Sequence, residues 1–265
     1  MKTILLPIVG DSGMEGRLEA AISLAHDQKA HLSCLQILPL PFGLWAGEAS
    51  GMTYSLMIRD AEGAAKDRRN ETEARLSQEQ ASWDWYVRTG DPVSELTTGS
   101  RLADMVIVGS GPGDGAPAVH IAANLAVHVT IPVLAFPVNA YSFDPGGPMM
   151  IAWNGSAEAA NALRNSLSLI SKASGVHLVV IDEGSSAFPA EDAGKFLSRH
   201  GISAVVKKLT AKTSIEETLE TAARDIEASC IIMGAYGHSR TREMIFGGVT
   251  RHMLKNSTIP LLLSH

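Results

Sequence analysis

Short apolar runs alternate along the chain with segments in which apolar residues recur at helical spacing. Residues 31–38 and 176–181 are continuous apolar runs, which is typical of strands buried on both faces of a parallel sheet. Leu18, Ile22 and Ala25 illustrate the helical spacing between two such runs. This alternation predicts a parallel sheet with helices on both faces.

The pattern occurs twice, in the same order. The matching segments are 4–9 with 149–153, 31–38 with 176–181, 103–109 with 228–234, and 130–134 (Thr-Ile-Pro-Val-Leu) with 258–262 (Thr-Ile-Pro-Leu-Leu). The sequence therefore predicts two tandem doubly wound five-stranded domains, residues 1–139 and 149–265, joined by a linker at 140–148 that contains Pro-Gly-Gly-Pro.

Charge and cysteine content narrow the class of protein. The net charge is −6 with both signs spread along the chain, which argues against a nucleic-acid or membrane-surface partner. No apolar run approaches the ~20 residues of a membrane span. Cys34 and Cys230 both lie in or beside apolar runs, so we expect buried thiols in a cytoplasmic protein.

Glycines cluster in the second copy where two predicted strands end. Asn154-Gly155-Ser156 follows its first strand, the segment 234–240 (Gly-Ala-Tyr-Gly-His-Ser-Arg) follows its fourth, and Gly247-Gly248-Val249-Thr250 opens the next helix. Ligands of open parallel sheets bind beyond the carboxyl ends of the strands. Backbone N–H groups in such loops and at a helix N-terminus attract anions. The spacing predicts a phosphate site to which Ser239, Arg240 and Thr250 add side-chain contacts, although Gly247-Gly248 could equally be only a turn before a helix.

The spacing Gly-x-x-Gly, nine residues and Gly, followed by a helix and Ile-Pro-Leu-Leu-Leu, resembles the ATP-binding signature of the universal stress protein family. Residues 151–156 look like the first strand and turn of that family. The resemblance implies a Rossmann-like fold of the adenine nucleotide alpha-hydrolase type that binds ATP or AMP, with Mg²⁺ as an accompanying ion. The nucleotide-binding residues that it implies are Ala152, Trp153, Asn154, Gly155, Ser156, Ile181, Gly234, Gly237, His238, Ser239, Arg240, Gly247, Gly248, Val249 and Thr250. Two residues depart from the family pattern, which has Asp at position 154 and Ser or Thr at position 248.

The first copy lacks the same donor set. Pro112, which has no N–H, stands where the second copy has Gly237. Val119-His120 replaces Gly247-Gly248, and Asp114 adds a negative charge. We therefore expect a degenerate nucleotide site in the first copy and one functional site, in the second.

Three functions fit the sequence. The first is a nucleotide-binding stress-response regulator, which the resemblance favours. The second is a weak Mg²⁺-dependent ATPase that uses His238 or Asp182. Asp182-Glu183 could bind Mg²⁺ beside the phosphates, although a solvated strand end is the simpler interpretation of this pair. The third is a module that binds a partner or a ligand other than a nucleotide. No catalytic set is evident, since neither a Walker lysine loop nor a Gly-x-Ser-x-Gly elbow occurs.

The resemblance also implies that the two domains pair about a pseudo-two-fold axis through their last strands, near Val133–Phe136 and Leu261–Leu263. A further homodimer is compatible with that arrangement. Residues 40–56, which include Phe42, Trp45 and Tyr54, predict an aromatic loop that acts as a lid or as a ligand or partner site.

Overall fold

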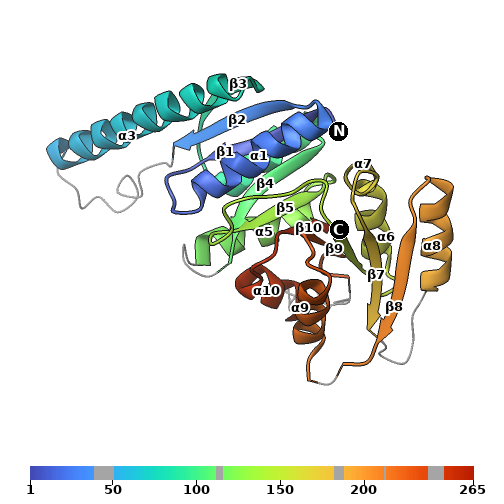
Figure 1. Ribbon diagram of the computed structural model, residues 1–265. Coiled ribbons are helices and arrows are strands. Elements are labelled where there is room, and N and C mark those ends of the chain that lie inside the picture. Colours follow the sequence, from blue (N-terminus) through green and yellow to red (C-terminus); the bar gives the residue numbers. More distant parts are fainter. Residues whose placement is uncertain (39–50, 112–115, 182–187, 212, 238–247) are drawn as a thin grey trace.

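The computed structural model describes residues 1–38, 51–111, 116–181, 188–211, 213–237 and 248–265; for residues 51–58 and 116 it describes the backbone alone. These residues form one ten-stranded sheet with helices on both faces (Figure 1). The strands run in the order β3-β2-β1-β4-β5-β10-β9-β6-β7-β8. Each half of the sheet is thus a 3-2-1-4-5 arrangement of the kind found in doubly wound folds.

The elements alternate as the sequence pattern predicts. The strands are β1 (Thr3–Ile8), β2 (His31–Leu38), β3 (Ser82–Thr89), β4 (Met105–Ser110), β5 (Val133–Pro137), β6 (Met149–Ala152), β7 (Val176–Ile181), β8 (Ala204–Leu209), β9 (Cys230–Gly234) and β10 (Leu261–Ser264). The helices are α1 (Met14–Gln28), α3 (Gly51–Gln78), α4 (Pro92–Gly99), the short 3₁₀ helix η1 (Ser100–Leu102), α5 (Ala116–His128), α6 (Ala157–Asn165), α7 (Leu167–Ile170), α8 (Ala190–Arg199), α9 (Ile215–Asp225) and α10 (Gly248–Asn256).

The two halves join through their last strands. β5 and β10 pair antiparallel, whereas every other described strand pair is parallel. Leu134 lies opposite Leu262, with Val133 opposite Leu263 and Ala135 opposite Leu261. The repeat itself makes Leu134 equivalent to Leu262. This symmetric register confirms the predicted pseudo-two-fold pairing of the domains inside one chain.

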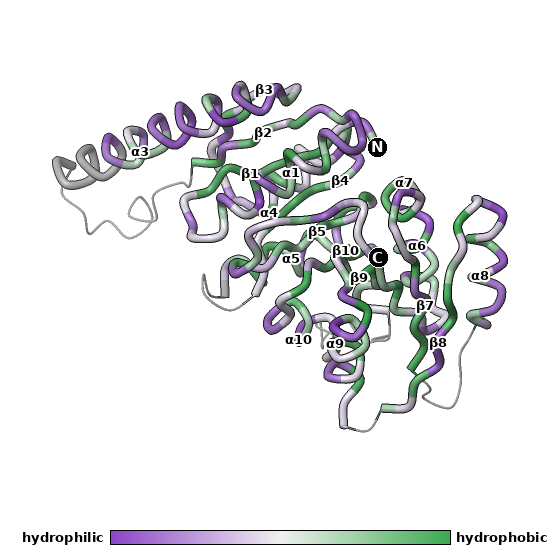
Figure 2. Tube along the Cα trace, viewed as in Figure 1, coloured by the Kyte–Doolittle hydropathy of each residue, from purple (hydrophilic) through white to green (hydrophobic). Residues whose placement is uncertain are grey.

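Two cores follow from the pleat of the sheet, because successive side chains of a strand point to opposite faces. In β1, Ile4 and Leu6 belong to a core beneath α1, α3, α6, α7 and α8, and Leu5 belongs to a core beneath α4, α5, α9 and α10. Both cores run through the two domains. Figure 2 shows the corresponding apolar strands inside and hydrophilic outer faces on the helices.

Helix α3 corrects one boundary of the sequence analysis. The sequence pattern predicts an aromatic loop that reaches residue 56, but the helix begins at Gly51. Much of the aromatic loop, residues 39–50 with Phe42 and Trp45, lies outside the described residues. Its proposed role as a lid or a ligand site stays a prediction.

The segment between β5 and β6 is folded onto the protein. Phe143 is buried in the core beneath α1 and α6, and the Asp144 carboxylate accepts a hydrogen bond from the Gly146 N–H at 2.9 Å. The boundaries at residues 139 and 149 stay a prediction. Within the described part of the chain, no helix is long and apolar enough to cross a membrane.

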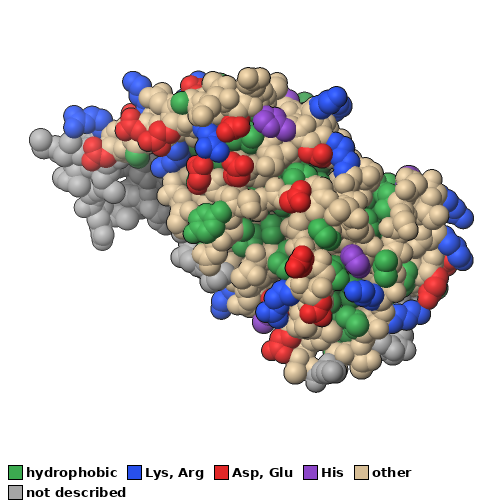
Figure 3. Space-filling view, in the orientation of Figure 1, with side chains coloured by type: hydrophobic (Ala, Val, Ile, Leu, Met, Phe, Trp, Pro, Cys, Tyr) green, Lys and Arg blue, Asp and Glu red, His purple; other side chains and the backbone are tan. Residues whose placement is uncertain are grey.

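Charged side chains of both signs are interspersed over much of the face drawn in Figure 3. Ion pairs account for part of this mixing, such as Arg75 with Glu19 at 2.8 Å and Lys172 with Asp27 at 3.1 Å. The second pair links the two domains.

Candidate functional site

A cavity of about 300 Å³ opens at the carboxyl ends of the strands of the C-terminal domain. It lies between β6 and β9, where the chain, having built β7 and β8 on one side of β6, continues on the other side. This is the topological switch point at which ligands of open α/β sheets bind.

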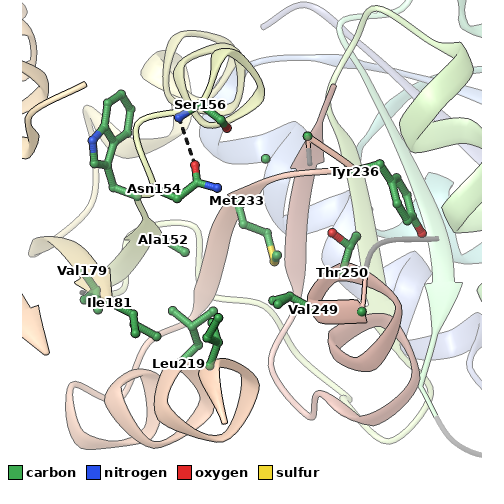
Figure 4. Close-up of a pocket in the computed structure, with 15 residues that line it drawn as sticks. Ala152, Asn154, Ser156, Val179, Ile181, Leu219, Met233, Tyr236, Val249 and Thr250 are labelled. Carbon is green, nitrogen blue, oxygen red and sulfur yellow. Dashed lines mark hydrogen bonds between the residues drawn. The ribbon is translucent and has the colours of Figure 1, made fainter. Parts of the chain in front are cut away.

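The cavity has an apolar end and a polar end. Figure 4 shows Val179, Ile181 and Leu219 gathered at one end, and Tyr236 and Thr250 at the other. Met233 and Val249 lie between the two ends. The complete lining is Ala152, Trp153, Asn154, Ser156, Val179, Ile181, Ile215, Leu219, Met233, Gly234, Tyr236, Gly237, Gly248, Val249 and Thr250.

The turn after β6 is held by two short-range hydrogen bonds. The Asn154 Oδ1 atom accepts from the Ser156 N–H at 3.1 Å (Figure 4), and the Ser156 hydroxyl accepts from the Ala159 N–H at 3.1 Å. Ser156 thereby caps the N-terminus of α6. Gly155 has φ +76°, which a glycine adopts without strain. These bonds fix Asn154 and Ser156 at the edge of the cavity.

The turn after β9 requires glycine at its first position. A Cβ atom on Gly234 would lie 2.5 Å from the backbone nitrogen of Ala159 in α6. The Ala235 N–H donates to the Ser264 carbonyl at 2.8 Å, which ties the turn to β10. Tyr236 follows with φ +62°, so a non-glycine residue holds a left-handed conformation in this turn.

Tyr236 keeps its proton over the physiological range. Burial raises the pKa of its hydroxyl to about 12, and the nearby positive charge of Arg251 opposes this shift only in part. The phenol that borders the cavity at this end is therefore neutral.

Two further groups shape the polar end. Gly248 begins α10, and Thr250, which is buried, lies in the first turn of that helix. The Glu158 carboxylate lies against Gly237, in the space where a Cβ on that glycine would stand. Glu158 is half-buried in the first turn of α6 and does not line the cavity itself, so its carboxylate lies beside Gly237 at the polar end.

The structure brings ten of the fifteen predicted residues to this cavity. Gly155 belongs to the turn but does not line the cavity. His238, Ser239, Arg240 and Gly247 lie outside the described residues, so their predicted contacts stay predictions.

Sequence reasoning missed the apolar wall. Val179, Ile215, Leu219, Met233 and Tyr236 also line the cavity. Periodicity offered a signal for three of them, since Val179 shares a strand face with Ile181, and Leu219 stands one helical turn after Ile215. No sequence pattern indicates a role for Glu158, because only the packing of α6 against the turn after β9 places its carboxylate beside Gly237.

The corresponding place in the N-terminal domain is filled by an arginine. Arg17 of α1 is 2% exposed and forms an ion pair with Asp11. A Cβ on Gly109 would lie 2.8 Å from the Arg17 Nη1 atom, and one on Gly13 would lie 2.9 Å from it. The guanidinium therefore occupies the space between the turns after β1 and β4. Pro112 and Asp114 lie outside the described residues.

A metal site is not formed by the described residues alone, since among them no three His, Cys, Asp or Glu side chains are grouped as ligands. Asp182 and Glu183, which could bind Mg²⁺ or be only a solvated strand end, fall outside that part of the chain. The Mg²⁺ prediction stays open to test.

Fold and cavity define a doubly wound α/β protein with a ligand-sized hollow at its switch point. The family model of the universal stress proteins matches residues 1–137 and 182–265. The chain belongs to the universal stress protein family, as two tandem domains. No curated protein matches it in sequence.

Solved structures share the two-domain fold. A universal stress protein from Archaeoglobus fulgidus superimposes with a TM-score of 0.79 at 17% identity, over 99% of this chain and 97% of that one. A functionally unknown protein from Pseudomonas aeruginosa gives 0.64 at 15% identity, over 100% and 92% of the two chains. At such identities the likeness concerns the fold.

Proposed function

We propose that this universal stress protein is a regulatory protein that binds an adenine nucleotide, ATP or AMP, in the cavity of its C-terminal domain. The observation that carries the proposal is that Gly234, Gly237 and the start of α10 at Gly248 border the same cavity as an apolar slot. A purine base needs an apolar slot, and phosphates need backbone N–H donors at a helix N-terminus.

The two ends of the cavity suit the two ends of a nucleotide. Val179, Ile181 and Leu219 offer apolar contact to the base. Thr250 and the amides that begin α10 offer donors to phosphate oxygens. About 300 Å³ stands at the lower end of the ~300–1,000 Å³ typical of ligand pockets, so a compact nucleotide fills it.

Mg²⁺ would neutralise part of the phosphate charge. Asp182 and Glu183 directly follow Ile181, which is the last residue of β7 and lines the cavity. Carboxylate oxygens are ligands that Mg²⁺ prefers, so these residues are the ones that we propose to hold it.

A route from the cavity to the domain junction supports a regulatory role. Helix α10, whose first turn borders the cavity, packs against its repeat equivalent α5. The Gly111 N–H of the first domain donates to the Leu254 carbonyl of α10 at 2.8 Å. A ligand that orders the start of α10 would thereby bias the contact between the domains.

The test is a titration of ATP and AMP, with and without Mg²⁺, against the intact chain and two bulky variants. Val249→Trp fills the proposed cavity and should weaken binding at least tenfold. Ala160→Trp is the matched control, since Ala160 is also half-buried on a helix but lines a different cavity. Absence of binding to the intact chain, or equal loss in both variants, would overturn the proposal.

A further inference from the structure

A second and larger cavity, of about 520 Å³, lies between α6 and α8 of the C-terminal domain. Its lining is Trp153, Gly155, Ser156, Ala157, Ala160, Leu163, Arg164, Phe188, Asp192, Ala193, Lys195, Phe196 and Arg199. It shares only Trp153 and Ser156 with the first cavity. None of the residues proposed to contact phosphates takes part in it.

The interior of the second cavity is apolar. Ala157, Ala160 and Leu163 recur at a spacing of three and form one face of α6. Ala193 and Phe196 face them from α8, and the two helices leave room between them because three of these five residues are alanines. Space of this kind suits an aliphatic chain or an aromatic ring.

An aromatic residue lies at the mouth. Phe188 is 51% exposed, which is unusual for so large an apolar side chain. Its carbonyl accepts a hydrogen bond from the Trp153 indole N–H at 3.1 Å. That bond holds the segment before α8 beside the end of β6, so Phe188 stands at the cavity with its backbone anchored.

The rim is positively charged. Arg164, Lys195 and Arg199 line the cavity, and Asp192 is the only carboxylate among the described residues of the lining. Lys195 pairs with Asp192 at 2.9 Å. Arg164 donates to the amide oxygen of Asn161, and Arg199 forms no ion pair with any described residue. Figure 3 shows basic side chains gathered over α8, at the right edge of the view.

We propose that this cavity binds an amphipathic organic anion, a small molecule with an apolar body and one carboxylate or sulfonate group. The body lies between α6 and α8, against Leu163 and Phe196, and the charged group meets Arg164 and Arg199 at the rim. Because Lys195 is paired with Asp192, Arg164 and Arg199 give the described part of the rim a net positive charge. This charge attracts an anionic ligand and contributes no such attraction to a neutral or cationic one. The site is separate from the proposed nucleotide cavity and does not depend on it.

The probe is 8-anilinonaphthalene-1-sulfonate, an aromatic sulfonate whose fluorescence rises in apolar surroundings. It should bind the intact chain with a stoichiometry near one. Dodecanoate should displace it, whereas dodecylammonium, with the same chain and the opposite charge, should displace it at least tenfold less well.

Four variants locate the probe. Ala160→Trp, which fills the second cavity, should weaken binding at least tenfold, and Arg199→Gln should weaken it about fivefold. Arg224→Gln removes an exposed arginine on α9 that lines neither cavity, and Val249→Trp fills the first cavity. Both should bind the probe as the intact chain does.

Partial unfolding cannot imitate the expected result, because it exposes apolar surface and raises the fluorescence of this probe. The proposal is overturned if Ala160→Trp binds the probe unchanged, if Val249→Trp abolishes binding, or if dodecylammonium competes as well as dodecanoate.

Discussion

Leu134 and Leu262 lie directly opposite each other where β5 and β10 pair, and they are equivalent residues of the internal repeat, 128 positions apart. The pseudo-two-fold axis of the molecule therefore passes between them. Both side chains are fully buried. The pairing of β5 with β10 makes the two half-sheets one sheet. It thereby fixes the relative placement of the two domains.

We predict that Leu134→Ala and Leu262→Ala each lower the free energy of unfolding by about 2–5 kcal/mol, through lost apolar contact and the cavity that remains. Because the two sites are related by the pseudo-symmetry, the two losses should agree within about 1 kcal/mol. Urea unfolding measures both. Leu102→Ala, at a leucine that is 93% exposed, is the control and should change stability by less than about 0.5 kcal/mol. Losses of unfolding free energy that differ threefold between the two variants would contradict the symmetric pairing of β5 and β10.

The buried ion pair of the first domain gives a second prediction. Asp11→Asn leaves the Arg17 guanidinium buried without its counter-charge and should cost about 2 kcal/mol, less than for a fully buried pair because Asp11 is 24% exposed. Adding Arg17→Met should recover part of that loss, since no buried charge is then left. Asp192→Asn breaks the more exposed Lys195 pair and should cost under about 0.5 kcal/mol. Thermal or urea unfolding of the four proteins decides whether Asp11 matters more than Asp192.

Glu158 gives a prediction about affinity. Its carboxylate lies against Gly237, which lines the polar end of the proposed nucleotide cavity, and it would repel a phosphate bound there. Glu158→Gln should therefore tighten ATP binding about fivefold when Mg²⁺ is absent, which corresponds to ~1 kcal/mol of relieved repulsion. Glu217→Gln, an exposed change near the start of α9, is the control. A weaker binding of the Glu158→Gln protein would show that the carboxylate helps the ligand instead.

The two cysteines should be inert in the folded protein. Burial raises the pKa of both thiols to about 12, and Asp84 and Glu73 add to the shift at Cys34. At pH 8 about one thiol in ten thousand is then ionised, compared with about a quarter in an unfolded chain. A disulfide reagent such as 5,5′-dithiobis(2-nitrobenzoate) should modify neither thiol until urea is added. Rapid reaction of one thiol in the folded state would contradict the described burial.

The same shift sets a pH dependence. The folded protein holds thiol protons that the unfolded chain releases above its pKa of about 8.5, so stability should fall as the pH rises through the window from about 8.5 towards 12. Cys230→Ala removes one of these protons and should flatten the decline. An unchanged slope in that variant would place the origin of the decline elsewhere.

The repeat made most of the fold predictable. Matching segments fixed the order of the elements, and continuous apolar runs such as 31–38 matched β2 to the residue. The register at Leu134 and Leu262 was predictable only through the family resemblance, because nothing in an apolar run tells which strand lies beside it. The start of α3 was missed because Met52 and Tyr54 precede its polar portion and hide the helical pattern.

The sequence identified residues that line the cavity where a local turn or helix start needs them, and it did not identify residues that only packing brings there. Gly234, Gly237 and Gly248 could be picked out because a turn and a helix start favour glycine. Glu158 and the buried Arg17 could not be picked out from the sequence. Each side chain lies against a glycine, Gly237 or Gly109, that is distant in the sequence and adjacent only in the folded chain. The basic rim between α6 and α8 is likewise assembled from two helices.

We propose that the C-terminal domain binds nucleotide and that the N-terminal domain does not. Calorimetric titration of ATP, ADP and AMP against the intact chain tests it most directly, with Gly237→Pro as the variant that removes one N–H donor and disturbs the turn at Tyr236. We expect a stoichiometry near one for the intact chain and loss of binding in a variant that still unfolds cooperatively. A stoichiometry near two, or unchanged binding in the variant, would contradict it.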